Sequence, residues 1–126
     1  MDELNPINGL KFEVIRRPLI FKKPAKTSRN TLTEKPCYYL KATNSLGQTY
    51  MGECSLIPGL SLETETDALS ELQRIASGST LDLNLVPKEL PSVRFAVEML
   101  LLALHGLTPE SNFSRGIEGL EINGLV

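Results

Sequence analysis

The sequence is poor in the residues that most often perform catalysis or bind metals. Its 126 residues include one histidine, two cysteines and no tryptophan. Cys37 and Cys54 are too widely spaced for a zinc-binding pair, and no HExxH, GxGxxG, P-loop or CxxC motif occurs. The single histidine, His105, follows a long apolar run, where a helix cap or a surface position is expected rather than a catalyst. Residue types alone therefore reveal no catalytic constellation.

Long apolar runs and a charge excess of one sign are also absent. No run approaches the roughly 18 residues of a membrane span, and the N-terminus, MDELNPINGL, lacks the apolar core of a secretory signal. With 13 basic and 15 acidic residues the net charge is -2, so neither nucleic acid nor a membrane is an expected partner. The basic cluster of Lys22, Lys23, Lys26 and Arg29 contains no aromatic residue, which favours a solvated loop. We expect a cytoplasmic protein with reduced thiols.

The N-terminal part predicts one strand followed by a long loop. Residues 10–21 are rich in β-branched and aromatic side chains, and Pro18 suggests an edge strand or a bulge. Residues 22–36 are polar and show no period of two or 3.6, so we expect a mobile loop there.

Two further segments predict a hairpin. Residues 37–44 and 48–56 flank a short turn in which Gly47 would take the left-handed conformation. The register that follows brings the apolar positions of both segments to one face of the sheet. It places Cys37 and Cys54 on opposite faces, which disfavours a disulfide between them. Together with the first strand, this predicts a three-stranded antiparallel meander.

The second half changes to helical periodicity. Residues 64–77 carry apolar side chains at helical spacing, and Gly78 fits the helix end. Residues 91–106, PSVRFAVEMLLLALHG, begin with proline and end with glycine, as helices commonly do. This second segment has one apolar face and another that includes Phe95 and Met99, so burial on most sides is predicted. The fold class is therefore α+β, a meander followed by a small helical bundle.

Carboxylates gather near the start of the first helix. Glu63, Glu65 and Asp67 lie there, where negative charge is favourable to the helix dipole, and this explains all three without a site. Glu53 lies at a strand end. For this residue a role near a ligand stands against a purely structural hydrogen bond.

The loop between hairpin and helix is unusually apolar. The stretch GECSLIPGLS, residues 52–61, places Leu56, Ile57 and Leu60 around a Pro-Gly turn, whereas loops on the surface are usually polar. We expect these three side chains to be exposed, and an exposed apolar loop of this kind raises the question of what it covers.

The order of these segments resembles the N-terminal capping domain of the enolase superfamily and, within it, o-succinylbenzoate synthases. The similarity lies in Gly52-Glu53 followed by Pro58-Gly59-Leu60-Ser61, in PSVRFAVE at 91–98 and in INGLV at 122–126. It covers nearly the whole chain. The resemblance implies an enolase N-terminal-like capping domain over residues 1–121, with residues 122–126 beginning a (β/α) barrel that is absent.

The resemblance also implies a function. Such enzymes are magnesium-dependent lyases of menaquinone biosynthesis that form o-succinylbenzoate by dehydration. The lysines and magnesium ligands of the family belong to the barrel, so this chain alone is expected to be inactive, with no catalytic residue and no metal. Two cap loops, here 22–35 and 54–61, close over the barrel mouth in the family. The implied substrate-binding residues are Ser55, Leu56, Ile57, Pro58, Gly59, Leu60, Lys26 and Arg29.

The expected partners follow from the same resemblance. They are the chain's own C-terminal barrel and a small carboxylate substrate, and exposed apolar surface would also allow a homodimer. Two alternatives stay open. The chain is the cap of another superfamily enzyme, such as a dipeptide epimerase, acylamino-acid racemase or muconate cycloisomerase, or it is a free-standing module that binds a protein partner through the apolar loop.

Overall fold

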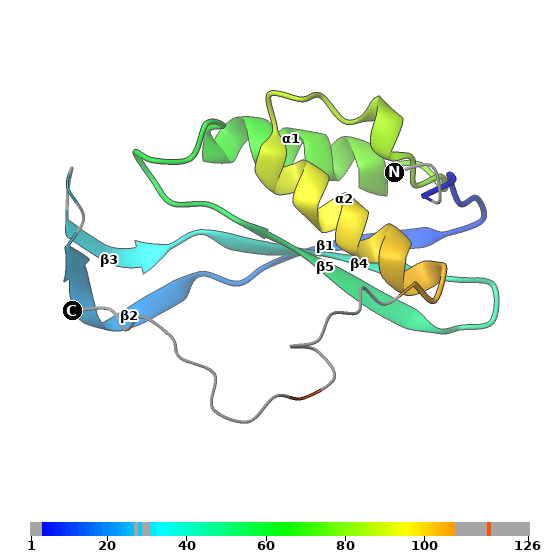
Figure 1. Ribbon diagram of the computed structural model, residues 1–126, viewed down its shortest axis with the longest axis horizontal. Coiled ribbons are helices and arrows are strands. Elements are labelled where there is room, and N and C mark those ends of the chain that lie inside the picture. The colour runs from blue at the N-terminus through cyan, green and yellow to red at the C-terminus, as the bar shows by residue number, and fades with distance from the viewer. Residues whose placement is uncertain (1–3, 27, 29–30, 108–115, 117–126) are drawn as a thin grey trace.

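Strands precede helices in the part of the chain that the computed structural model describes, residues 4–26, 28, 31–107 and 116. β1, β4 and β5 form one antiparallel sheet in the order β1-β4-β5, and β2 and β3 pair separately. Figure 1 shows α1 and α2 together over one face of the three-stranded sheet, with the β2–β3 hairpin extending beyond its end. The elements are β1 (Lys11–Arg16), β2 (Leu19–Lys26), β3 (Thr31–Lys35), β4 (Cys37–Thr43), β5 (Thr49–Ser55), α1 (Glu65–Ala76), the 3-10 turn η1 (Leu83–Leu85) and α2 (Pro91–Leu104).

The predicted hairpin register is confirmed. Tyr38 lies opposite Cys54 and Leu40 lies opposite Gly52, and Gly47 takes a positive φ of 80° in the connecting turn. Because successive residues point to opposite faces, Cys37 and Cys54 are directed away from each other, and both are free thiols. The fold class predicted from the sequence, α+β with an antiparallel sheet and two helices, is likewise confirmed.

The prediction of a mobile loop at residues 22–36 is wrong. This segment supplies most of the β2–β3 hairpin, with Lys26 opposite Thr31 and Leu19 opposite Lys35. The hairpin separates β1 from β4 along the chain, and the single strand expected at residues 10–21 is divided between β1 and β2. The hairpin projects beyond the core and most of its side chains are exposed, with Leu32 of β3 as the buried exception, so it shows no regular apolar alternation. The sequence therefore lacks the periodic signal by which strands are recognised.

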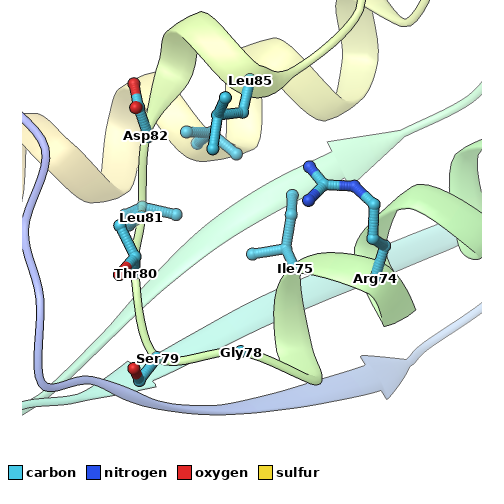
Figure 2. A pocket seen from close by; sticks show the side chains of 9 residues that line it. Arg74, Ile75, Gly78, Ser79, Thr80, Leu81, Asp82 and Leu85 are labelled. Atoms are coloured by element: carbon cyan, nitrogen blue, oxygen red, sulfur yellow. The ribbon is translucent and has the colours of Figure 1, made fainter.

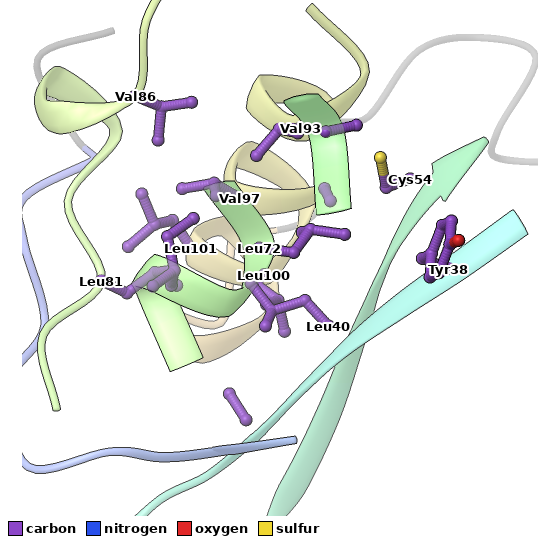
Figure 3. Packing of buried hydrophobic residues seen from close by; sticks show 14 of the residues in the cluster. Tyr38, Leu40, Cys54, Leu72, Leu81, Val86, Val93, Val97, Leu100 and Leu101 are labelled. Carbon is purple, nitrogen blue, oxygen red and sulfur yellow. The ribbon is translucent and has the colours of Figure 1, made fainter. Parts of the chain in front are cut away.

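The core lies where the helices meet the three-stranded sheet. Leu40 of β4, Leu72 of α1 and Leu100 of α2 are fully buried there, and Figure 3 shows their side chains close together. Gly52 explains how closely α2 approaches the sheet. A Cβ atom at that position would lie 2.1 Å from the backbone oxygen of Ala96, so only glycine permits this contact.

The prediction that α2 is buried on most sides is wrong. Val97 and its neighbours face the core, but Phe95 is 55% exposed and Met99 is 42% exposed. The sheet, α1 and η1 lie against α2, and the described residues cover the side that carries Phe95 and Met99 only in part. His105 fits its prediction as a cap: it is the C-cap residue of α2, and its Nε2 lies 2.8 Å from the backbone oxygen of Asn5. No helix in the described residues has the length and apolar character that crossing a membrane requires.

Candidate functional site

The apolar loop between β5 and α1 is built as a defined turn. Leu60 N donates to Ile57 O at 3.0 Å, which closes a four-residue turn with Pro58 and Gly59 at its centre. Gly59 has a φ of 82°, and proline followed by a left-handed glycine is the pattern of a type II turn. Ser61 reinforces the turn, because its hydroxyl accepts from Ile57 N at 2.8 Å. Its own hydrogen bonds therefore hold the loop in shape.

The loop exposes some of its apolar side chains and buries another. Ile57 is 36% exposed, Leu60 45% and Leu62 74%, as expected of a surface that covers something. The expectation that Leu56 is exposed with them is wrong, since it is 2% exposed and belongs to the core. The reason is the strand period: Gly52, Cys54 and Leu56 alternate onto the helix-covered face, so Leu56 continues β5 inward.

A cavity of about 400 Å³ lies against this loop. Pro36, Ile57, Pro58 and Leu62 give it apolar walls, and Glu63 and Glu65 are also among its lining residues. None of the described residues that line it is a lysine, an arginine or a histidine. The described walls of the cavity are therefore largely apolar and include no basic side chain.

Glu63 is the more buried of these two carboxylates. It is 8% exposed, and its Oε1 accepts from the backbone N–H of Ser92 at 3.3 Å, near the beginning of α2. Its Oε2 is buried and has no hydrogen-bond partner among the described residues. Together with burial, the larger cause, the neighbouring Glu63 carboxylate raises the pKa of the Cys54 thiol to about 12.

Sequence reasoning missed this role for Glu63 by assigning it to the dipole of α1. The N-cap of α1 is Thr64, whose hydroxyl accepts from Asp67 N at 3.1 Å, so Glu63 lies before the helix. It faces the other helix instead. A capping threonine directly after Glu63 was the available signal that this glutamate lies outside the first turn.

Glu65, in contrast to Glu63, is bonded to the side chains of other residues. The Tyr38 hydroxyl donates to its Oε2, and the Arg16 guanidinium Nε lies 4.0 Å from the same oxygen. Burial, followed by the hydrogen bond to the Glu65 carboxylate, raises the pKa of Tyr38. This arrangement fastens the beginning of α1 to the ends of β1 and β4.

Glu53 lies on the sheet face that the helices leave open. It accepts a long hydrogen bond of 3.5 Å from the Cys37 thiol, which is the structural role considered for it from the sequence. With Lys35, Ser55 and Phe95 it lines a shallow cavity of about 320 Å³. Burial is the main cause that raises the pKa of Cys37, and the bond to Glu53 adds to it, so this thiol is not an activated nucleophile.

The basic hairpin lies at the same end of the molecule as the apolar loop (Figure 1). Lys26 is exposed at the end of β2, and it does not line the cavity beside the loop. Arg29, the other basic residue predicted to bind substrate, lies outside the described residues. The structure thus brings Ile57, Pro58 and Gly59 to one cavity, places Ser55 at another, buries Leu56, and carries Lys26 on a separate element.

A smaller cavity, of about 200 Å³, lies at the opposite end of α1 (Figure 2). Its charged groups are already engaged: Arg74 bonds Glu71 at 2.7 and 2.6 Å, and Asp82 caps η1 through Asn84 N. It therefore offers little to a ligand. Among the described residues, no group of three His, Cys, Asp or Glu side chains is arranged to hold a metal.

Comparison with known proteins gives one sequence relative and several structural ones. No protein-family model matches the chain. The chain is 32% identical to o-succinylbenzoate synthase of Desulfotalea psychrophila over an alignment that is 158 residues long. This match covers 95% of this chain and 43% of the relative. The chain thus spans less than half the length of that enzyme.

Three solved structures share the fold at lower identity. An enolase-superfamily member from Roseovarius nubinhibens has a TM-score of 0.59 at 18% identity, over 81% of this chain and 31% of that chain. A mandelate racemase/muconate lactonizing protein from Herpetosiphon aurantiacus gives 0.57 at 19%, over 75% and 30%. The o-succinylbenzoate synthase of Thermosynechococcus elongatus, solved with magnesium in its active site, gives 0.53 at 18%, over 64% and 25%.

The sequence match and the structural matches are consistent with each other. The structures support the fold, and the sequence relative covers almost all of this chain. The resemblance predicted from the sequence is confirmed: the chain is similar over 95% of its length to part of an o-succinylbenzoate synthase, and its fold is shared by solved structures of the enolase superfamily.

Proposed function

We propose that this chain is the substrate-specificity domain of an o-succinylbenzoate synthase-like enzyme whose reaction takes place in a separate barrel domain. The observation that supports this most directly is the loop 56–62. It holds Ile57, Leu60 and Leu62 in solvent on a turn fixed by its own hydrogen bonds, in a chain similar to such an enzyme. Apolar side chains held outward in this way are suited to cover another surface.

The loop would act by excluding water. Where the loop covers a bound substrate, Ile57 and Leu60 would replace solvent at the apolar part of the substrate. A dry site strengthens the electrostatic contacts that stabilise charge developing in the transition state. Leu56 would contribute differently, because its buried side chain anchors the loop from below instead of touching substrate.

The basic hairpin would serve the carboxylates of the substrate. Lys22, Lys23 and Lys26 are exposed on β2, and Arg29 follows them in the sequence. Exposed cations attract an anionic ligand over about a Debye length, which is roughly 8 Å at physiological salt. The cavity beside the apolar loop has apolar walls and no lysine, arginine or histidine among its described lining residues, so it offers a carboxylate no cation. The proposed substrate would therefore place its charged groups toward the hairpin and its apolar part toward Ile57 and Leu60.

The proposed reaction is the loss of water from a carboxylate substrate to give o-succinylbenzoate. The groups that remove the proton and bind magnesium would come from the barrel, and we assign no catalytic residue to this chain. Its own share is binding, orientation and the exclusion of water. The partners are accordingly the barrel domain and a small carboxylate, and a cytoplasmic location remains a prediction.

A chimera tests this function. The part of the Desulfotalea psychrophila enzyme that this chain matches would be replaced by this chain, and magnesium-dependent dehydration would be measured. The double variant Ile57→Ala, Leu60→Ala should lower kcat/KM by about tenfold or more, since it removes two half-exposed apolar contacts. Leu46→Ala is the matched control, because Leu46 is an exposed leucine in the distant β4–β5 turn.

Two results would contradict the proposal. Dehydration by the isolated 126-residue chain would show that the chemistry lies here and not in a barrel. Equal kcat/KM for the double variant and the Leu46→Ala control would show that the apolar loop does not cover the substrate.

A further inference from the structure

The segment that leads into β1 is held to the connector after α1 by backbone hydrogen bonds. Ile7 and Leu81 exchange two of them, at 3.0 and 2.8 Å, and Leu10 N donates to Ser79 O at 2.9 Å. Leu10 is 2% exposed and Leu81 is 1% exposed, so these bonds close one edge of the core. The two residues between Ile7 and Leu10, in contrast, are exposed to solvent.

These two residues are Asn8 and Gly9, an asparagine followed by a residue whose nitrogen is open to its side chain. Gly9 has a φ of 74°, a Cβ atom there would meet nothing within 4 Å, and its N–H bonds no other described residue. Oδ1 of Asn8 accepts from the Thr80 hydroxyl at 2.8 Å, which polarises the side-chain carbonyl. Nδ2 of Asn8 has no hydrogen-bond partner among the described residues. The amide is therefore open to attack by the Gly9 nitrogen, and its own nitrogen is free to leave.

Asn44 shows the opposite arrangement in the β4–β5 turn. Its Oδ1 accepts from Leu46 N at 3.0 Å and from Gln48 N at 2.9 Å, and its Nδ2 donates to Gln48 Oε1 at 2.9 Å. The residue that follows is Ser45, whose side chain crowds the backbone nitrogen in a way that glycine does not. The turn thus holds both ends of the Asn44 amide.

We propose that Asn8 is converted to aspartate and isoaspartate in the folded protein, with water and hydroxide as the only co-reactants. Hydroxide removes the Gly9 N–H proton, and the nitrogen attacks Cγ of Asn8. The new bond closes a succinimide ring, the Cγ–Nδ2 bond breaks, and Nδ2 takes a proton from water and leaves as ammonia. Water then opens the ring. Cleavage of the bond between nitrogen and Cγ gives aspartate, and cleavage of the bond between nitrogen and the backbone carbonyl carbon gives isoaspartate.

Isoaspartate would loosen this edge of the core, because it lengthens the backbone by one carbon between Ile7 and Leu10. The bonds from Ile7 to Leu81 and from Leu10 to Ser79 cannot then both keep their register. Aspartate leaves the backbone unchanged, and its carboxylate can still accept from the Thr80 hydroxyl. This inference goes beyond the proposed function and does not depend on it.

Ageing of the folded 126-residue chain at mildly alkaline pH tests the proposal. The tryptic peptides 1–11 and 42–74 contain Asn8 and Asn44, and the other asparagine of peptide 1–11 precedes Pro6, which has no N–H to attack with. Mass spectrometry should show replacement of the amide by a hydroxyl at least about tenfold faster in peptide 1–11, because glycine permits the closest approach of its nitrogen. An isoaspartyl methyltransferase should then methylate the aged peptide.

Asn8→Gln is the control for this measurement. It keeps an amide oxygen for the Thr80 hydroxyl but would have to close a six-membered ring, so peptide 1–11 should stay unchanged. Equal rates in the two wild-type peptides, or no conversion of wild type beyond that of Asn8→Gln, would overturn the proposal.

Hydrogen exchange tests the structural consequence. In the isolated isoaspartate form, the N–H groups of Leu10 and Leu81 should lose protection at least about tenfold, whereas Asn8→Asp should retain it. Equal protection in the isoaspartate form and in wild type would refute the loosening. None of these measurements involves turnover, so their failure and that of the proposed function are distinguishable.

Discussion

Gly52→Ala should strongly destabilise the domain. The new Cβ atom would lie 2.1 Å from the backbone oxygen of Ala96 and 2.8 Å from its carbonyl carbon, well inside the 3.0 Å that real Cβ contacts respect. The obstacle is helix backbone, which has no rotamer that moves it aside. α2 would therefore have to move away from β5 by about 1 Å, which loosens the core contacts on both sides of Gly52.

The magnitude follows from the kind of contact. Overpacking a core by one methyl group typically costs about 1–3 kcal/mol, and a clash with fixed backbone belongs at the upper end, about 3 kcal/mol. In a domain of this size that corresponds to a fall in Tm of roughly 10 °C. Urea denaturation followed by circular dichroism would measure the free energy of unfolding directly.

Gly78→Ala is the matched control for this substitution. A Cβ atom at Gly78 would meet nothing closer than 3.8 Å, and this residue has no positive φ, so stability should change by less than about 0.5 kcal/mol. If Gly52→Ala is as stable as Gly78→Ala, then α2 does not pack against β5 at Ala96. The assignment of the core would have to be revised.

Three further predictions concern the loop, a buried thiol and the open face of α2. Leu56→Ala should lower the free energy of unfolding by about 3 kcal/mol, and Leu60→Ala by less than about 0.5 kcal/mol, in the same urea titration; equal losses would contradict the inward direction of Leu56. The Cys54 thiol has a folded pKa of about 12 against an ordinary value of 9.0, so its contribution to stability is complete below pH 9 and is lost as the pH rises toward 12. The wild type should therefore lose stability faster than Cys54→Ala over that range, and parallel pH curves would show that the thiol is not buried. Phe95→Ser with Met99→Ser should reduce binding of a hydrophobic dye and weaken any dimer in sedimentation equilibrium, because both side chains are exposed; unchanged dye binding would exclude this face as the apolar surface.

The local pattern of apolar residues was sufficient to predict the structure where one face of an element is buried. The register of β4 and β5 followed from alternating apolar residues and the glycine turn, and Tyr38 does face Cys54. The same alternation, carried one residue further than the strand, would have placed Leu56 in the core. The family resemblance predicted an exposed Leu56 instead, because it assigned the whole segment 54–61 to one surface.

The pattern of apolar residues failed to predict the structure where the burial of an element depends on what lies outside it. The β2–β3 hairpin extends beyond the helices, so its sequence has no apolar period and predicts a loop. In α2 the apolar sequence continues around the helix, although described residues cover one side only in part. Periodicity reports which residues avoid water in the working protein, and it does not say which neighbour keeps the water away.

The two ends of the apolar loop are fixed by contacts that are distant in sequence. At one end Leu56 lies in the core, and its N–H donates to Pro36 O at 3.1 Å. At the other end Glu63 accepts from Ser92 N, which fastens the loop to the beginning of α2. The exposed part between them is therefore held in place before any ligand arrives. A covering surface that is already ordered loses less conformational entropy on binding than a mobile one, so specificity would reside in the outward side chains Ile57, Leu60 and Leu62. Glu63→Ala, which removes the acceptor of the Ser92 backbone N–H, should then alter substrate selection although Glu63 does not touch substrate, because it releases the far end of the loop.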